Sequence, residues 1–267
     1  MAHNLNNIIV DRVLRGIFSD KDDNIIFSLN QIQDLSMSQT SESQEILDAL
    51  GVSIMELMRS KALEVSASNA IYDFGLLAAQ YGTNKVEVGT TMVVPMMQSI
   101  EVPAAEEDAT TVVCTLDHIP TSAITAVYEL NGDSTLGNKY IPGTGVEAKT
   151  FMHVDGEQTI TLPASAGGLD MFVMYEYETD KAIEIVNSAD KFAQMGKMTF
   201  EILAYDVCDP ETKLFGYLIL DRFQLSNDFD WAIGGDSQTH EFSGRAHVNY
   251  CDKNKKMCRV VIVDDED

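Results

Sequence analysis

Apolar and polar residues alternate along most of the chain, and this period of two predicts β-strands. A turn-forming cluster at 19–24 separates Ile8–Ile17 from Ile25–Thr40, so we expect these two segments to pair as a hairpin. Further strands are predicted at 111–119, 123–133, 156–163, 170–178, 197–209, 214–226, 240–251 and 258–265. The pattern favours a mainly β fold of antiparallel strands, a sandwich or barrel.

The segment 240–251 shows the alternation most clearly. One parity carries Phe242, Ala246, Val248 and Tyr250, and the other carries Ser243, Arg245, His247 and Asn249. A strand with one apolar and one polar face is typical of an antiparallel sheet that covers a core on one side only.

Residues 44–58 fit two descriptions. The positions that fit helical spacing are Ile46, Leu47, Leu50, Ile54, Leu57 and Met58, with Ser41 and Gln44 as a capping pair. Alternatively, 48–51 is a turn and 52–65 is one arm of a long hairpin. We favour the hairpin because it leads directly into the alternating residues 61–68, and the helix remains the alternative.

A short helix is predicted at 70–81. Ser68 or Asn69 can cap its start, Asp73 would lie in its first turn, and Gly82 can end it. Apolar residues occupy both of its faces: Ile71, Phe74, Leu77 and Ala78 on one, and Tyr72, Leu76, Ala79 and Tyr81 on the other. We therefore expect one face to back the sheet and the other to meet more of the chain or another subunit.

Composition adds charge to this picture. The 267 residues are 45% hydrophobic and 22% charged, as in an ordinary soluble protein, and no apolar run approaches the ~18 residues of a membrane helix. We expect no membrane anchor. The net charge is −24, from 42 Asp and Glu against 18 Lys and Arg. This balance argues against a surface that grips nucleic acid, because phosphate binding depends on clustered Lys and Arg.

The same acidity would suit a surface past which DNA slides without sticking, and composition does not choose between that role and simple solubility. The four cysteines are expected to be reduced, because the sequence carries no secretion signal. The acidic end, 264–267, is expected to be solvated and disordered.

Two interruptions of the strand pattern suggest domain boundaries. Pro, Ala and acidic residues break it at 102–111, and a second break lies at 178–191. We expect a β core made of 1–101 and 181–267, with 102–180 as an inserted or peripheral β module.

Metal-binding residue types gather near the C-terminus, but their spacing is unsuitable. The set is His240, His247, Cys251 and Cys258. It lacks the closely spaced ligand pairs of a zinc site, and the acidic segment 227–237 lacks the alternating oxygen ligands and closing glutamate of a calcium loop. Phosphate-binding loops and nucleophile motifs are absent from the sequence. We expect no metal, no cofactor and no enzymatic activity.

The stretch from Gln33 to Thr83 reads as a strand rich in Ser and Thr, a long hairpin ending in "RSK", an "SASNA" turn and a short apolar helix. In this order of features it resembles the tail tube (major tail) proteins of long-tailed bacteriophages. The stretch 175–251, which begins "YEYETDKAIEIV", is similar to the later half of such proteins. The resemblance is weakest over 100–170.

The resemblance implies a virion structural protein that assembles with copies of itself. Tail tube proteins are small β-sandwich or barrel folds that form hexameric rings, and the rings stack into a hollow tube for DNA ejection. Inner sheets of neighbouring subunits join into a continuous barrel, and the long hairpin bridges to the next ring. Other tail proteins are the further partners, DNA passes transiently, and assembly takes place in the host cytoplasm.

Residues for these roles follow from the resemblance and the alternation. The channel-lining candidates are Asp34, Ser36, Glu64 and Ser66, on the polar face of the predicted hairpin. The subunit-interface candidates are the apolar residues Met55, Leu57, Ile71, Phe74 and Leu77.

Two other functions remain open from the sequence. Another virion β protein, such as a head decoration or tail terminator subunit, would form a single ring or bind the capsid. A β-sandwich carbohydrate-binding module would expose a cluster of the aromatic residues Trp231, Tyr175 and Tyr177.

Overall fold

The structure is a computed structural model that describes residues 5, 7–209, 211–230, 239–250 and 253–263. Trp231, Cys251 and the acidic end at 264–267 lie outside the described residues. The fold is mainly β with antiparallel sheets and one α-helix in the described part, which confirms the predicted fold class. No helix within the described ranges is long and apolar enough to cross a membrane.

The chain divides into two compact units. Unit 1 comprises residues 1–85 and 184–267, and unit 2 comprises residues 86–183. Each unit has its own cluster of buried apolar side chains, so each is described by itself.

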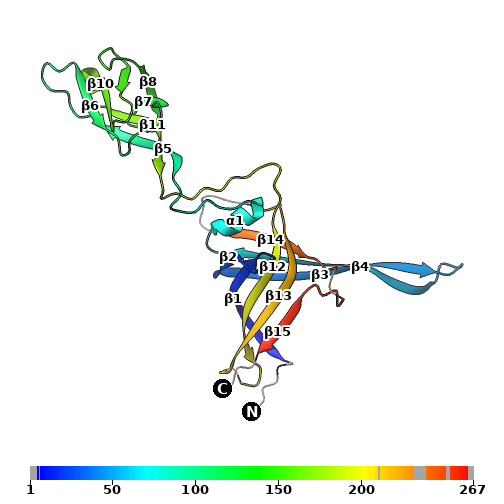
Figure 1. The fold of residues 1–267 in the computed structure, drawn as a ribbon. Helices are drawn as coiled ribbons and strands as arrows, with labels where there is room; N and C mark the ends of the chain where they lie inside the picture. The colour runs from blue at the N-terminus through cyan, green and yellow to red at the C-terminus, as the bar shows by residue number, and fades with distance from the viewer. Residues whose placement is uncertain (1–4, 6, 210, 231–238, 251–252, 264–267) are drawn as a thin grey trace. The chain divides into compact units, whose positions relative to one another are not determined.

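Unit 1 is built on one antiparallel sheet that curls into a half-barrel (Figure 1). Its strands are β1 (Ile8–Ser19), β2 (Ile25–Leu29), β3 (Ile32–Leu47), β4 (Ser53–Asn69), β12 (Met195–Asp206), β13 (Lys213–Leu225), β14 (His240–Ala246) and β15 (Arg259–Val263). They follow the order β2-β1-β12-β13-β14-β4-β3, and β15 pairs with β13 beside this path. Strands distant in sequence, such as β4 and β14, therefore lie side by side.

The core of unit 1 covers one face of this sheet. Phe18, Phe200 and Phe223 are fully buried in it, and Leu63 and Val65 reach it from β4. Alternate residues of β4 face the other way and are exposed, which is the half-buried pattern that the sequence predicted for 61–68.

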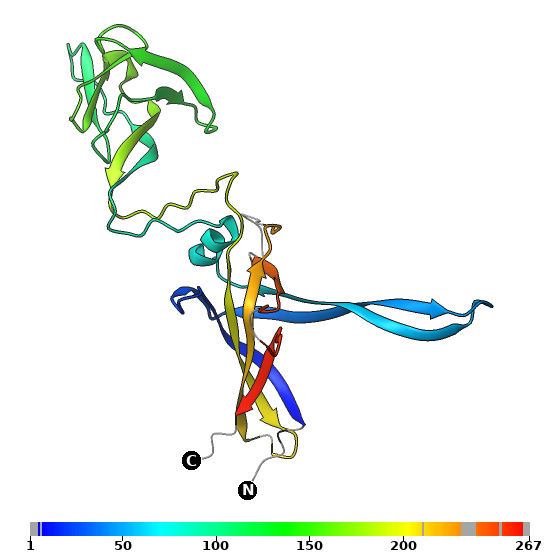
Figure 2. The same ribbon diagram turned by 45° about the vertical axis from the view of Figure 1, so that its right-hand side comes forward.

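β3 and β4 run out from the rest of unit 1 as a two-stranded arm (Figures 1 and 2). The chain reverses at 48–52, where the Asp48 carboxylate accepts hydrogen bonds from the backbone N–H groups of Leu50 and Val52, each at 2.8 Å. The hairpin favoured for 44–58 is confirmed, and the alternative helix is wrong. A carboxylate that bonds its own turn in this way stabilises chain reversal locally.

The helix α1 spans Phe74–Tyr81 and begins later than residue 70, the predicted start. Its N-cap is Asp73, whose Oδ1 accepts a hydrogen bond from the backbone N–H of Leu76 at 2.7 Å. Asn69 is not the cap because it ends β4, where its Oδ1 accepts a hydrogen bond from the backbone N–H of Gln31.

The end of α1 agrees with the prediction. Gly82 adopts the left-handed conformation, with φ of 69°, and its N–H bonds to the last helical carbonyls. A Cβ at this position would lie 1.9 Å from the carbonyl oxygen of Phe192, so only glycine fits. The helix is buried from Gly75 to Gln80, as its apolar faces required.

Unit 2 is a seven-stranded sheet around a second core. Its strands are β5 (Met92–Glu101), β6 (Thr111–Thr115), β7 (Ala126–Leu130), β8 (Leu136–Pro142), β9 (Thr150–His153), β10 (Thr159–Pro163) and β11 (Asp170–Thr179), with a 3₁₀ turn at Ala164–Ala166. Their order is β5-β11-β7-β8-β9-β10-β6. All the pairings given for unit 2 are antiparallel except β8 with β9.

Several strand predictions need correction. The predicted strand Ile25–Thr40 is two strands, because the chain bends at 30–31, so the partner of β1 in the first hairpin is β2 alone. The strand predicted at 240–251 ends at Ala246. The sequence pattern missed β5, whose first six residues are all apolar rather than alternating, β8, which shows no regular alternation, and the short strand β9.

Candidate assembly surfaces

A polar face runs across β3, β4 and β14, on the side of the sheet opposite the core. The register sets Ser36 opposite Ser66, and Ser66 opposite Ser243 on its other side. We call this surface the polar strip and define it by Ser36, Ser38, Glu64, Ser66, Ser243 and Arg245. Three of the four channel-lining candidates therefore lie together on one face. The fourth, Asp34, lies at one end of it.

The charges at the centre of the polar strip form a pair. Both Nε and Nη2 of Arg245 lie 2.7 Å from Oε1 of Glu64. Both side chains are exposed, so the pair contributes at most about 1 kcal/mol to stability. Its larger effect is electrostatic: the two charges cancel, so the centre of the strip carries hydroxyl groups and no net charge.

The end of the polar strip near Asp34 is acidic. Asp34 sits in the bulge of β3 with a left-handed φ of 53°. Its neighbours around a pocket of about 440 Å³ include Asp228, Asp230 and Glu241. Within the described residues, no group of three or more His, Cys, Asp or Glu could hold a metal ion. Carboxylates grouped in this way repel phosphate groups.

The arm has a polar shaft and an apolar tip. Beyond Leu35, every residue of β3 is exposed, and from Ser53 to Ala62 of β4 only Leu57 is not, so the outer part of the ribbon has no covered face. We call the apolar end the arm tip: Ile46, Leu47, Leu50, Val52, Ile54, Met55 and Met58, all exposed. Leu50 at the turn is 88% exposed. The predicted interface residue Met55 belongs to this tip, and Leu57 beside it is half-buried.

The interface candidates near α1 differ in exposure. Ile71 and Phe74 are exposed, whereas Leu77 is only 4% exposed and packs inside unit 1. Ile71 and Phe74 therefore remain available to a neighbour, and the role of Leu77 is in the core of its own subunit.

A buried hydrogen-bond pair joins α1 to the sheet. Gln80 donates from Nε2 to the backbone carbonyl of Glu241 at 3.1 Å, which leaves its Oε1 to accept from Nε2–H of His240 at 2.8 Å. Burial lowers the pKa of His240, and the charge of Asp73 opposes this only in part. His240 is therefore a neutral core residue, and its Nδ1 has no partner in the described part of the structure.

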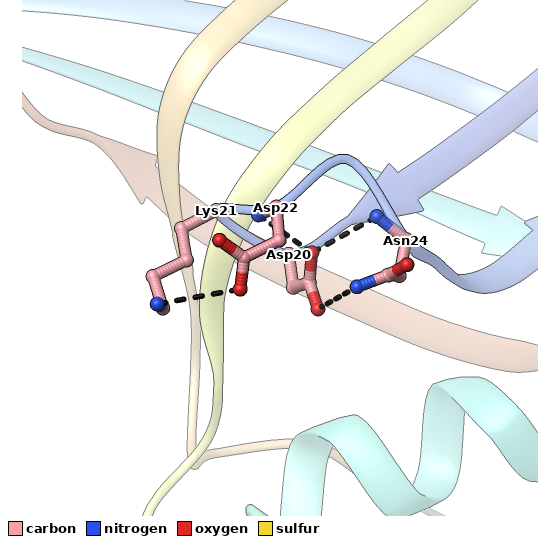
Figure 3. A network of polar contacts seen from close by, with 4 residues as sticks. All are labelled: Asp20, Lys21, Asp22 and Asn24. Carbon is pink, nitrogen blue, oxygen red and sulfur yellow. Dashed lines mark hydrogen bonds and ion pairs between the residues drawn. The ribbon is translucent and has the colours of Figure 1, made fainter.

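The turn between β1 and β2 is held by a carboxylate (Figure 3). Asp20 accepts hydrogen bonds from the backbone N–H groups of Asp22 and Asn24, and from the Asn24 side-chain amide at 3.0 Å. The hydrogen bond from the side-chain amide of Asn24 is the largest of the effects that lower the pKa of Asp20. Lys21 lies 3.3 Å from Asp22 in the same turn. These contacts fix a turn, and they do not converge on a ligand.

Other groups that could suggest chemistry have structural roles. Burial raises the pKa of the Cys114 thiol, which makes the reactive thiolate scarcer. Tyr175 is fully buried and donates its hydroxyl to Oε1 of Gln98 at 3.0 Å. It cannot serve as an exposed stacking platform, so the carbohydrate-binding alternative loses one of its three aromatic residues. Tyr177 stacks on His118 at 3.9 Å.

These surfaces define a mainly β assembly protein that has a long arm and a polar sheet face. A family model described as the YomU/Tube protein family matches residues 7–260. The chain belongs to the YomU/Tube protein family, and the resemblance to phage tail tube proteins is confirmed. It is thus a tube-type structural protein of the virion tail, which assembles with itself and with other tail proteins. The comparison with curated proteins found no match.

The contribution of β14 to the polar strip was missed by sequence reasoning. The alternation had placed Ser243 and Arg245 on one polar face, but it gave no sign that this face lies beside Glu64 and Ser66. The pairing of β4 with β14 depends on the register of the whole sheet, and no local sequence pattern encodes that register. One signal was available: Glu64 and Arg245 carry opposite charges and lie on the polar faces of their predicted strands, which is compatible with pairing between these strands.

Proposed function

We propose that the protein is a tail tube subunit that forms hexameric rings, and that the rings stack into a tube through which DNA is ejected. The observation that carries the proposal is the outer edge of unit 1. β3 is 16 residues long, ends the sheet on its side, and contains neither proline nor lysine. Long edges of this kind pair with another chain unless the protein protects them.

The polar strip supports its use as the channel lining. Serine hydroxyls and one balanced ion pair offer DNA neither a cluster of cations to bind nor an apolar surface. A lining with clustered Lys and Arg would hold the duplex, because it carries one phosphate charge per ~1.7 Å. Under this proposal, Asp34, Ser36, Glu64 and Ser66 face the channel, and Ser243 and Arg245 join them.

Unit 2 is proposed as a peripheral module inserted into the tube-forming core. The backbone N–H of Gly89 bonds to the carbonyl of Asp180 at 2.7 Å, so the two connections run side by side at the base of unit 2. A module that enters and leaves at one point can be added to a fold without changing its sheet. We place the tube-forming surfaces in unit 1.

The direct test is negative-stain microscopy of the purified protein over a series of concentrations. We expect hollow tubes of uniform diameter, with six-fold symmetry in end views. Single rings that never stack would support a terminator or decoration subunit and would contradict the proposal. A monomer at every concentration would also contradict it.

The channel lining has a separate test in virions. Glu64→Lys places two like charges beside each other and makes the strip cationic, so we expect slower DNA ejection. Glu64→Gln is the comparison variant: it leaves one uncompensated cation, Arg245, in place of two, so it should slow ejection less than Glu64→Lys. Equal ejection rates for Glu64→Lys and the unchanged protein would contradict this placement.

A further inference from the structure

An apolar groove lies open between β1 and β3 on the core side of the half-barrel. Near its closed end, the two strands meet where Ile32 approaches Gly16; a Cβ on Gly16 would lie 2.6 Å from the isoleucine side chain. Along the rest of β1 and β3, the space between them widens into a groove of about 420 Å³. Its apolar lining is Val10, Val13, Leu35, Met37, Ile202 and Leu218. We call this the open groove.

The open groove is an uncovered part of the core. Val13, Leu35 and Ile202 pack against the buried cluster of unit 1 from its margin. Met37 is paired with the buried Val65, which places both on the core face, yet Met37 is 47% exposed. Apolar side chains on the core face of a sheet are normally covered, and none of the residues that the structure describes covers these.

The arm of the same chain cannot supply that cover. The turn at Asp48 lies eleven residues beyond Met37 along β3, about 36 Å at about 3.3 Å per residue. β3 and β4 stay paired along this length, so the ribbon cannot fold back. The arm tip of one chain therefore cannot reach the open groove of the same chain.

Charge favours a second copy of this chain as the occupant. Two copies that each carry a net charge of −24 repel one another over most of their surfaces. The arm tip carries less charge, because residues 46–58 hold two ionisable groups, Glu56 and Asp48, and the carboxylate of Asp48 already bonds to its own turn. The rim of the open groove offers the exposed guanidinium of Arg12 beside Asp11 and Asp34. The approach of this apolar tip, with its two carboxylates, to a rim that includes the cation of Arg12 lessens the general repulsion.

We propose that the arm tip of one copy seats in the open groove of a second copy, with Leu50 and its neighbours completing the second copy's core. The inference rests on the proposed tube and names the surface that receives the arm. Tip and groove are different surfaces, so the contact is head-to-tail and leaves one tip and one groove free at the ends of any chain of copies. Such a contact propagates, as a tube requires.

Cross-linking between two variants tests the contact. Leu50→Cys and Met37→Cys are made in separate chains in which Cys208, Cys251 and Cys258 are serine. The two are mixed before assembly and treated with a short bis-maleimide. We expect a cross-linked heterodimer from the mixture. The matched control replaces Met37→Cys by Thr40→Cys, an exposed position on the same strand and on its opposite face.

The outcomes of this experiment separate the contact between tip and groove from the proposed tube. Tubes in which position 50 links no better to position 37 than to position 40 would overturn the inference and leave the tube standing. Linkage of 50 to 37 without any tube would support the contact and count against the proposed tube. Absence of both tube and linkage would overturn both.

A second variant measures the strength of the contact. Leu50→Asp puts a charge at an exposed turn, so the subunit itself should fold as before. Burial of one leucine side chain corresponds to roughly a ten- to hundred-fold change in association, so we expect the concentration needed for assembly to rise by about that factor. Leu136→Asp, at an exposed leucine in unit 2, is the control and should leave assembly unchanged. Equal effects of the two variants would contradict the proposal.

Discussion

The two units treat the edges of their sheets in different ways. In unit 2, the edge strand β5 carries Pro95 and the opposite edge, β6, has five residues; both features discourage pairing with another chain. In unit 1, β3 is 16 residues long and contains no proline, and the core lies partly open beside Met37. Under the proposed function, unit 2 is a finished β fold, whereas the sheet of unit 1 is completed by copies of the same chain.

The charge of the molecule does not follow this division. Unit 2 holds 15 Asp and Glu against three Lys, so it is at least as acidic per residue as unit 1. The excess acid is therefore not a signature of a channel lining. The distinguishing features of unit 1 are its strand edge, its arm tip and its open groove.

Matched truncations in the two cores should lower the free energy of unfolding the most. Phe200→Ala in unit 1 and Phe151→Ala in unit 2 each remove a buried ring, which costs about 3–5 kcal/mol of unfolding free energy. Because the cores are separate, calorimetry should give two transitions, and each variant should lower the midpoint of only one. A single transition displaced alike by both variants would show that the units fold as one.

Loss of the helix cap should have a smaller effect, confined to unit 1. Asp73→Ala removes the bond to the Leu76 N–H and should cost about 1 kcal/mol. Chemical denaturation followed by the fluorescence of Trp231, the lone tryptophan, gives the free energy. Asp73→Ser, which keeps a capping oxygen, should recover most of the loss; failure to do so would remove capping as the explanation.

The stability of unit 1 should depend on pH through His240. Burial lowers its folded pKa, so the unfolded chain binds the proton more readily. The stability that neutral His240 contributes is complete above the unfolded pKa of about 6.5. It declines as the pH falls from there toward the lower pKa of the folded protein. The melting temperature of unit 1 should therefore be lower at about pH 5.5 than at about pH 7.5, and His240→Gln should reduce this difference. An unchanged pH response in the variant would exclude this histidine as its source.

Removal of the Asp20 carboxylate should act only on the first turn of unit 1. Hydrogen bonding lowers the pKa of Asp20, so the turn is favoured above the ordinary carboxyl pKa and is lost as the pH falls through the lowered folded value. Asp20→Ala should speed amide hydrogen exchange at Asp22 and Asn24 and leave unit 2 unaffected. Exchange rates equal to those of the unchanged protein would contradict a role for this carboxylate.

Local chemistry made part of the fold predictable. The turn at Asp48 and the helix end at Gly82 follow from a side-chain acceptor and a glycine that act within a few residues. The alternation in β4 likewise predicted which of its residues are exposed, including Glu64 and Ser66. Three of the four channel-lining candidates consequently fall on one surface.

Pairings between distant strands could not be predicted in this way. The partner of Glu64 is Arg245, and β5 pairs with β11 across most of unit 2. Such registers depend on the whole sheet, whereas an alternating pattern gives only the facing of each residue. Leu77 illustrates the same limit, because an apolar helix position gave no indication of whether its own subunit or a neighbour would bury it.

We expect unit 1 alone to carry the surfaces that build the tube. The most direct measurement is electron microscopy of a chain in which residues 90–179 are removed and Gly89 is joined to Asp180 through a short Gly-Ser linker, which the bond between these two residues permits. We predict tubes with the same channel and axial repeat as those of the full chain. A folded, monomeric product at concentrations where the full chain forms tubes would contradict the claim.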